Sequence, residues 1–128
     1  MRALFGAILV LVLSSLHAMA ADKAATESDE AALARVRAEI LSLIGQAPCR
    51  NLVHCRLLPL GLRPCGGPAE YLAYSSGFSD RTALETKASE YAFLLEEIQS
   101  NQAGACVVLP EPQAVCIDNR CRVQPKKQ

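Results

Sequence analysis

The chain has 128 residues, and its 13 Lys and Arg residues balance its 13 Asp and Glu residues, so the formal net charge is zero. A neutral chain has no electrostatic reason to bind nucleic acid or an anionic membrane surface, and we expect neither as a partner. One domain is the natural count at this length. Its core will be thin, because aromatic residues make up only 5% of the chain and tryptophan is absent. Small domains with thin cores commonly add disulfides.

Residues 1–20 have the organisation of a cleavable secretory signal. Arg2 supplies a positive start, an apolar run follows from Ala3 to Leu13, and Ala18-Met19-Ala20 offers small residues to a signal peptidase. The run is too short to span a bilayer, which takes roughly 20 apolar residues. We therefore predict an exported, periplasmic protein with no stable membrane anchor after cleavage. Residues 21–27 are small and polar, and are predicted to form a flexible leader.

All the cysteines lie beyond the predicted signal, and an even number in an oxidising compartment predicts three disulfides. A zinc site is the competing hypothesis, but the sequence contains no CxxC pair and His54 is the one imidazole left after cleavage. We expect no metal and no cofactor. Six cysteines allow about 15 pairings, and the spacing leaves them open. The predicted disulfide residues are Cys49, Cys55, Cys65, Cys106, Cys116 and Cys121.

Two amphipathic helices are predicted from periodic apolar residues. Thr26 or Ser28 can cap the first helix, and Gly45 with Pro48 ends it. Ser79 or Asp80 can cap the second, with Gly104 expected as a left-handed residue beyond its end. We expect both apolar stripes to face the core rather than a partner. They are Leu33, Val36, Ile40, Leu43 and Ile44 in the first helix, and Leu84, Ala88, Tyr91, Leu95 and Ile98 in the second.

Short apolar pieces separated by Pro and Gly predict strands at Cys55–Leu62 and Tyr71–Ser75. Pro59 argues against a central position for the first of these. The tail predicts a strand, a proline-bounded turn and a hairpin turning at Asp118-Asn119. That register places Cys116 opposite Cys121, where a cross-strand bridge is expected.

These elements predict a single disulfide-stapled α+β domain over residues 28–123, with two helices packed on a small antiparallel sheet. Residues 124–128 form a polar tail.

No catalytic motif is found. The sequence contains no GxSxG, HExxH, phosphate-binding loop or dinucleotide fingerprint. A thiol enzyme using Cys65 would need a base, and His54 is the one histidine left after cleavage. As a bridge anchor, Cys65 would instead fix a tight turn. We therefore expect a binding protein rather than an enzyme.

The stretch from Arg63 to Pro68 predicts a rigid loop, since Gly66 and Gly67 permit a tight turn and the flanking prolines restrict the chain. A rigid loop lowers the ordering cost of binding. Two elements are candidates for partner contact, the Arg63–Ala69 loop and the Pro110–Gln113 turn. The candidate contact residues are Arg63, Gly66, Gly67, Tyr71, Tyr74 and Glu111. The two tyrosines are three residues apart on a strand, so we expect at most one to be exposed.

The segment CRLLPLGLRPCGGPAEYLAYS together with the tail CVVLPEPQAVCIDNRCRV resembles a group of small exported bacterial proteins. They share a CR…PCGGPxxYLxYS segment, a helix and a C…PxP…C…RC tail. The likeness covers roughly residues 45–123. It implies the fold and the compartment, and it transfers no catalytic residue. By class, a small neutral exported domain with disulfides is also similar to periplasmic immunity proteins, which block toxins delivered by rival bacteria.

The leading hypothesis is thus a periplasmic immunity protein that occludes the active site of a hydrolytic toxin, such as a secretion-system effector peptidase or a cell-wall hydrolase. The alternatives are an inhibitor of a host or self hydrolase, such as a protease or lysozyme, and an exported structural or binding module without inhibitory role.

Overall fold

The computed structural model describes residues 26–100 and 104–127, so the predicted signal peptide and most of the predicted leader lie outside the described residues. The α+β prediction is confirmed: two helices accompany four antiparallel strands. The strands form two separate two-stranded ribbons instead of one sheet. The elements are α1 Asp29–Ile44, a 3₁₀ turn Leu52–His54, β1 Cys55–Leu60, β2 Glu70–Ser75, α2 Arg81–Gln99, β3 Gln113–Ile117 and β4 Arg120–Gln124.

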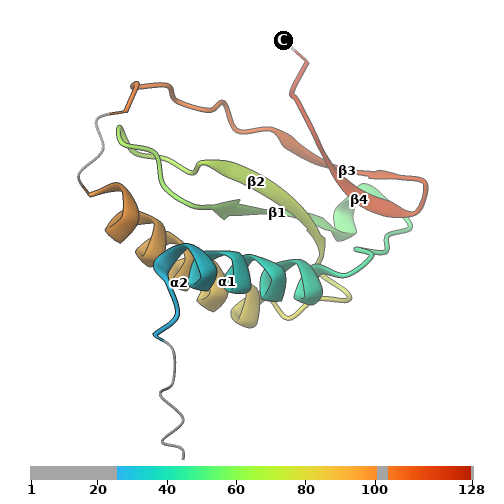
Figure 1. The fold of residues 1–128 in the computed structure, drawn as a ribbon. Coiled ribbons are helices and arrows are strands. Elements are labelled where there is room, and N and C mark those ends of the chain that lie inside the picture. Colours follow the sequence, from blue (N-terminus) through green and yellow to red (C-terminus); the bar gives the residue numbers. More distant parts are fainter. Residues whose placement is uncertain (1–25, 101–103, 128) are drawn as a thin grey trace, which may run out of the picture.

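The elements are arranged in layers (Figure 1). Helices α1 and α2 lie side by side on one side of the β1–β2 ribbon. The β3–β4 ribbon and the chain leading into it lie on the other side of β1–β2. Across residues 26–100 and 104–127, no helix has the length and apolarity needed to cross a membrane.

Helix α1 begins and ends where its sequence predicts. The Ser28 hydroxyl accepts a hydrogen bond from the Ala31 N–H at 3.2 Å. Gly45 ends the helix with φ +55°, and its N–H donates to the Leu41 carbonyl at 2.9 Å. The predicted stripe faces the core, with Val36 and Ile40 fully buried.

Helix α2 is capped by Asp80, whose carboxylate accepts from the Ala83 N–H at 3.0 Å. Ser79 has a different partner, because its hydroxyl donates to the Leu43 carbonyl at 2.9 Å and ties the two helices together. The prediction for Gly104 was wrong, since the helix ends at Gln99 with Ser100 as its C-cap. Gly104 packs instead on the Pro64 ring, where an added Cβ would lie 2.5 Å from Cγ.

Strand β1 is two residues shorter than predicted because Gly61 turns the chain with φ +73°. A larger residue would be crowded there, since an added Cβ would lie 3.0 Å from Leu95 Cδ2 and 3.1 Å from Ala69 Cβ. Strand β2 matches its prediction and begins one residue earlier.

The register of the β1–β2 ribbon explains how it tolerates Pro59. The Ser76 N–H donates to the His54 carbonyl at 2.8 Å, and hydrogen-bonded pairs alternate from there along the ribbon. Pro59 lies opposite Tyr71 in a pair that is not hydrogen-bonded, so its missing N–H costs no ladder bond. β1 is an edge strand, as Pro59 indicated.

The tail forms only part of what its sequence predicts. Residues 104–112 contain no strand, so the expected strand around Val107 is wrong. The hairpin is confirmed: Asp118 and Asn119 have φ +51° and +57°, and Cys116 lies opposite Cys121.

The bridge predicted between these two cysteines is nevertheless wrong. Cys116 is bonded to Cys49 and Cys121 to Cys55, with Cα–Cα distances of 6.0 and 5.3 Å. A bridge within the hairpin would close only a short loop. The observed bridges join residues 67 and 66 positions apart, and in the chain-entropy account longer loops remove more unfolded-state entropy.

Charged side chains cover the seam between α1 and α2. Arg35 pairs with Glu39 at 3.0 Å, and Lys87 pairs with Glu90 at 2.8 Å and also with Glu39. The Lys87 ammonium and the Arg35 guanidinium together hold the pKa of Glu39 below its ordinary value of 4.5.

We predict that acid weakens this seam. Because the pKa of Glu39 is lower in the folded state than in the unfolded state, its contribution is present above the unfolded value and is lost as pH falls through the folded value. When the pH falls from neutral to acid, the free energy of unfolding should therefore decrease less in the Glu39→Gln variant than in the parent. The difference should be small, because the ion pairs are exposed. Denaturant unfolding at several pH values measures this. Glu97→Gln, on the exposed face of α2, is the control and should show the same change in stability with pH as the parent. Identical pH curves for Glu39→Gln and the parent would contradict the prediction.

A second prediction concerns Gly61. Gly61→Ala should lower the free energy of unfolding by roughly 1–3 kcal/mol, because the new Cβ meets Leu95 and the backbone keeps a left-handed φ. Gly77→Ala is the matched control, since an added Cβ there has no heavy atom within 4 Å. It should stay within about 0.5 kcal/mol of the parent. Equal denaturant midpoints for the two variants would show that the close approach at Gly61 is unimportant.

Candidate partner-binding surface

The loop between β1 and β2 is held by its own backbone. The Arg63 N–H donates to the Gly67 carbonyl at 3.0 Å, and the Gly66 N–H donates to the Arg63 carbonyl at 2.9 Å. Gly66 and Gly67 have φ +89° and +80°, which suits glycine above other residues. A Cβ at either position would meet no heavy atom within 4 Å, so this turn faces open space.

This loop is joined to the irregular segment 104–112 at two points. Cys65 is bonded to Cys106, with their Cα atoms 5.2 Å apart. The Arg63 guanidinium donates through Nη1 to the Val107 carbonyl at 3.2 Å. Arg63 is half-buried and its Nε is enclosed, so its side chain holds the two segments together rather than projecting as a free charge.

The joined segments expose apolar side chains. Val107 and Val108 are 53% and 71% exposed, and Leu62 in the loop is 37% exposed. Sequence reasoning missed both valines because a strand would turn one of two neighbours inward. The prolines that follow them were the available signal that no strand forms there.

Next to this segment lies a groove of about 660 Å³, which has the size of a small-ligand or peptide site. It lies between the start of β2, the end of β4 and the two chain segments that follow α2 and β4. Its lining is mainly apolar. The lining residues are Glu70, Tyr71, Leu109, Pro110, Glu111, Pro112, Val123, Pro125 and Lys126.

The structure separates the two candidate tyrosines. Tyr71 is half-buried and lines the groove together with Glu111. Tyr74 is only 5% exposed and belongs to the core, so it is not accessible to a partner. The expectation that at most one of them is exposed is therefore confirmed, and Tyr74 is removed from the contact residues.

We use the name binding surface for the set of exposed features that these segments share. It comprises the turn at Gly66 and Gly67, the valine pair Val107-Val108, and the groove. The Cys65–Cys106 bridge and the Arg63 hydrogen bond connect the first two, and the chain continues directly from Val108 into the groove wall at Leu109 and Pro110. Both elements predicted to contact a partner lie on this surface.

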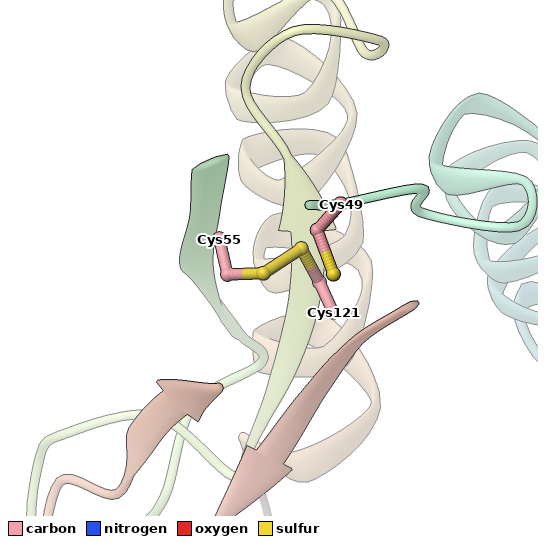
Figure 2. A group of neighbouring side chains, drawn as sticks. All are labelled: Cys49, Cys55 and Cys121. Atoms are coloured by element: carbon pink, nitrogen blue, oxygen red, sulfur yellow. A yellow bond between two sulfur atoms is a disulfide. The ribbon is translucent and has the colours of Figure 1, made fainter. Parts of the chain in front are cut away.

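A separate cluster of sulfur atoms lies at the other end of β1. The Sγ atoms of Cys49, Cys55 and Cys121 lie within 4.8 Å of one another, and all three residues are buried (Figure 2). Such spacing resembles a set of metal ligands, but each sulfur is already in a disulfide and provides no thiolate. The cluster is a structural junction.

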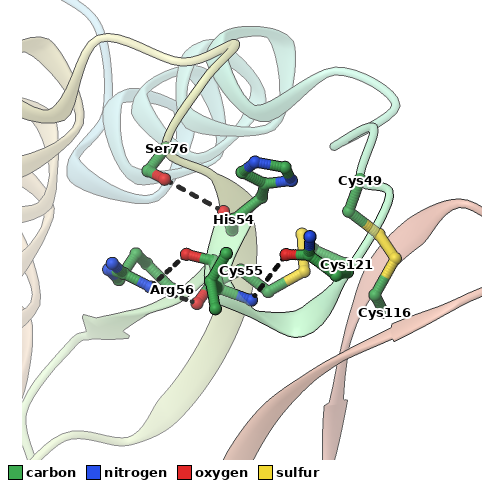
Figure 3. The surroundings of a disulfide bond; sticks show 9 residues. Cys49, His54, Cys55, Arg56, Ser76, Cys116 and Cys121 are labelled. Carbon is green, nitrogen blue, oxygen red and sulfur yellow. Dashed lines mark hydrogen bonds between the residues drawn. A yellow bond between two sulfur atoms is a disulfide. The ribbon is translucent and has the colours of Figure 1, made fainter.

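His54 lies beside this junction and not beside Cys65. Its carbonyl accepts from the Ser76 N–H and hydroxyl, at 2.8 and 3.1 Å (Figure 3). Its side chain lines a hollow of about 470 Å³ with Arg50 and the exposed ring of Phe78. Because the Cys65 sulfur is bonded to Cys106, the thiol that a Cys–His pair would need is not free.

Comparisons with models of protein families, with curated proteins and with solved structures gave no match. A functional assignment therefore depends on the geometry of the binding surface and on the chemistry that its residues allow.

The bridge Cys65–Cys106 should be what orders this surface. We predict that Cys65→Ser with Cys106→Ser lowers the free energy of unfolding by about 4 kcal/mol, from the chain entropy of a 41-residue separation. Amide exchange should accelerate at Arg63, Gly66 and Val107 in particular, because their N–H groups are hydrogen-bonded in this surface. Exchange measured by mass spectrometry or NMR tests this. Replacing Cys49 and Cys116 together is the control, because it opens a comparable loop and should leave exchange at Arg63 and Gly66 near that of the parent.

Proposed function

We propose that this protein is an exported binding protein that neutralises a hydrolytic toxin by covering its active site, as periplasmic immunity proteins do. The observation that carries the proposal is an exposed, partly apolar binding surface held on a cross-linked frame. Val107 and Val108 are unusually accessible for paired valines, and contiguous exposed apolar side chains are typical of interaction sites.

The rigidity of the surface supports this role. Binding costs free energy for every loop and side chain that becomes ordered in the complex. A surface that is already rigid in the free protein loses less conformational entropy, so this cost is smaller. The turn at Gly66 and Gly67 is fixed by two backbone hydrogen bonds and by the bridge at Cys65. The proline-flanked segment around Glu111 has little backbone freedom.

The chemistry of the surface suits contact with the active-site entrance of a hydrolase. Glu111 is exposed between Pro110 and Pro112, so its carboxylate is held on a stiff segment. A carboxylate presented in this way can ligate a catalytic metal or pair with a cation of the target. The exposed valines supply apolar contact area beside it.

The compartment is part of the same proposal. Three disulfides in a chain of this size are typical of proteins that fold in an oxidising environment. Together with the predicted signal at residues 1–20, they support export to the periplasm.

The proposal predicts that a neighbouring gene encodes a hydrolytic toxin, and co-expression of this protein with that toxin in the periplasm is the test. The parent should restore growth and co-purify with the toxin. Val108→Asp, which places a charge on an exposed valine, should weaken the complex roughly 5- to 30-fold, as the loss of an interface contact of about 1–2 kcal/mol does. Ile117→Asp is the matched control, since Ile117 is 41% exposed but lies on the hairpin away from the binding surface.

Gly67→Val adds bulk on the turn and should also weaken binding, provided that circular dichroism shows a folded variant. Failure to restore growth, together with absence of a complex, would overturn the proposal. Rescue and binding that are unaffected by both Val108→Asp and Gly67→Val would place the contact elsewhere on the protein.

A further inference from the structure

The outer edge of β2 is an unpaired strand edge next to the groove. Strand β2 pairs with β1 alone. Because hydrogen-bonded pairs alternate from Ser76 and His54, the backbone groups of Tyr71 and Ala73 point away from β1. Within residues 26–100 and 104–127, no hydrogen bond uses these backbone groups.

The neighbouring segment leaves this edge open. Leu109 to Pro112 runs along the groove that Tyr71 lines. Pro110 and Pro112 have no N–H to donate, and within the described residues no backbone hydrogen bond joins this segment to β2. The edge at Tyr71 thus has backbone groups that point away from β1, next to a groove whose lining is mainly apolar.

We propose that this groove binds an extended peptide segment of the partner protein, which adds as a strand to the outer edge of β2 at Tyr71. The inference rests on the proposed function, because it names the kind of partner segment that the binding surface receives. In strand addition, main-chain hydrogen bonds supply affinity and pockets for alternate side chains supply specificity. The Tyr71 peptide group supplies a donor and an acceptor here.

The groove also indicates the side chains that the segment carries. Glu70 is occupied by Arg37 of α1 through a two-point ion pair, one contact of which is 3.2 Å. The remaining charges in the lining, Glu111 and Lys126, are opposite in sign. The apolar lining then favours an extended segment with an uncharged apolar side chain at the position that faces Val123, which is 39% exposed.

The outer edges of β1 and β4 fit an added strand less well. On β1, the outward positions end at Pro59, which cannot donate. On β4, Cys121 already donates to the Ala47 carbonyl at 2.8 Å, and in the turn before β4 the Asn119 carbonyl accepts from the Cys49 N–H. The edge at Tyr71 thus combines a free peptide group with an adjoining apolar groove.

The experiment isolates the backbone contribution at Tyr71. A phage-displayed library of random twelve-residue peptides is selected on the protein purified after export, and one selected peptide is synthesised for fluorescence anisotropy. Tyr71→Ala removes the ring alone, whereas Tyr71→Pro removes the ring and the N–H. Neither disturbs a bond to β1, because Tyr71 lies in a pair that is not hydrogen-bonded.

We expect Tyr71→Pro to bind the peptide roughly tenfold more weakly than Tyr71→Ala, through the lost hydrogen bond and the blocked approach. Amide exchange at Tyr71 should slow in the parent when the peptide binds. Val123→Asp should weaken binding and Ile117→Asp should not, although the two positions are about equally exposed on one hairpin. Thermal unfolding confirms that each variant is folded.

Three results would overturn the inference. One is a selection that yields no peptide binder. Another is equal affinity for Tyr71→Pro and Tyr71→Ala, which would mean that side chains alone bind the ligand. The third is a self-association that Tyr71→Pro abolishes, which would make a second copy of the chain the occupant.

The proposed function and the groove can fail independently. A toxin complex that Val108→Asp weakens and Tyr71→Pro leaves intact would retain the function and reject the groove. A peptide that binds as described, with no toxin rescued, would retain the groove and reject the function.

Discussion

The pair of neighbouring disulfides at the buried sulfur cluster is the constraint on which the rest of the structure depends. A two-stranded hairpin is marginal by itself in water, and β3–β4 is attached to the body of the protein through Cys116 and Cys121. Two backbone hydrogen bonds strengthen the same junction. The Cys49 N–H donates to the Asn119 carbonyl at 3.0 Å, and the Cys121 N–H donates to the Ala47 carbonyl at 2.8 Å. Because Val123 belongs to strand β4 of this hairpin, the junction also positions one wall of the groove.

The cross-links compensate for a small core. The largest fully buried side chains are only Ile40, Leu60, Leu84 and Val36, and a domain of this size leaves little margin between burial and chain entropy. With the chain closed by covalent bonds, the segment after α2 need not bury its apolar residues to stay in place. Val107 and Val108 can therefore remain exposed, which a domain held by its core alone would tolerate poorly.

Local rules predicted the elements, and long-range geometry decided the rest. The caps at Ser28 and Asp80 and the turn at Asp118 need only neighbouring residues, and all three are confirmed. The disulfide pairing depends on which segments meet across 66 or 67 positions, so a correct hairpin register still led to a wrong bridge. The candidate surface was predicted in part, with Tyr71 and Glu111 brought together and Tyr74 placed in the core. The groove itself needs the packing of two ribbons that no local pattern specifies.

Proline placement makes the edges of the β1–β2 ribbon unequal. An exposed strand edge promotes unwanted pairing, and proteins commonly protect such edges with proline. Pro59 provides that protection on β1 at no cost to the ladder. On the β2 side, the prolines lie instead in the neighbouring segment at 110 and 112, and within the described residues this segment makes no backbone hydrogen bond to β2. One edge therefore carries a proline, and the other is left unpaired. An edge left open beside an apolar groove has a physical use if another chain is to add a strand there.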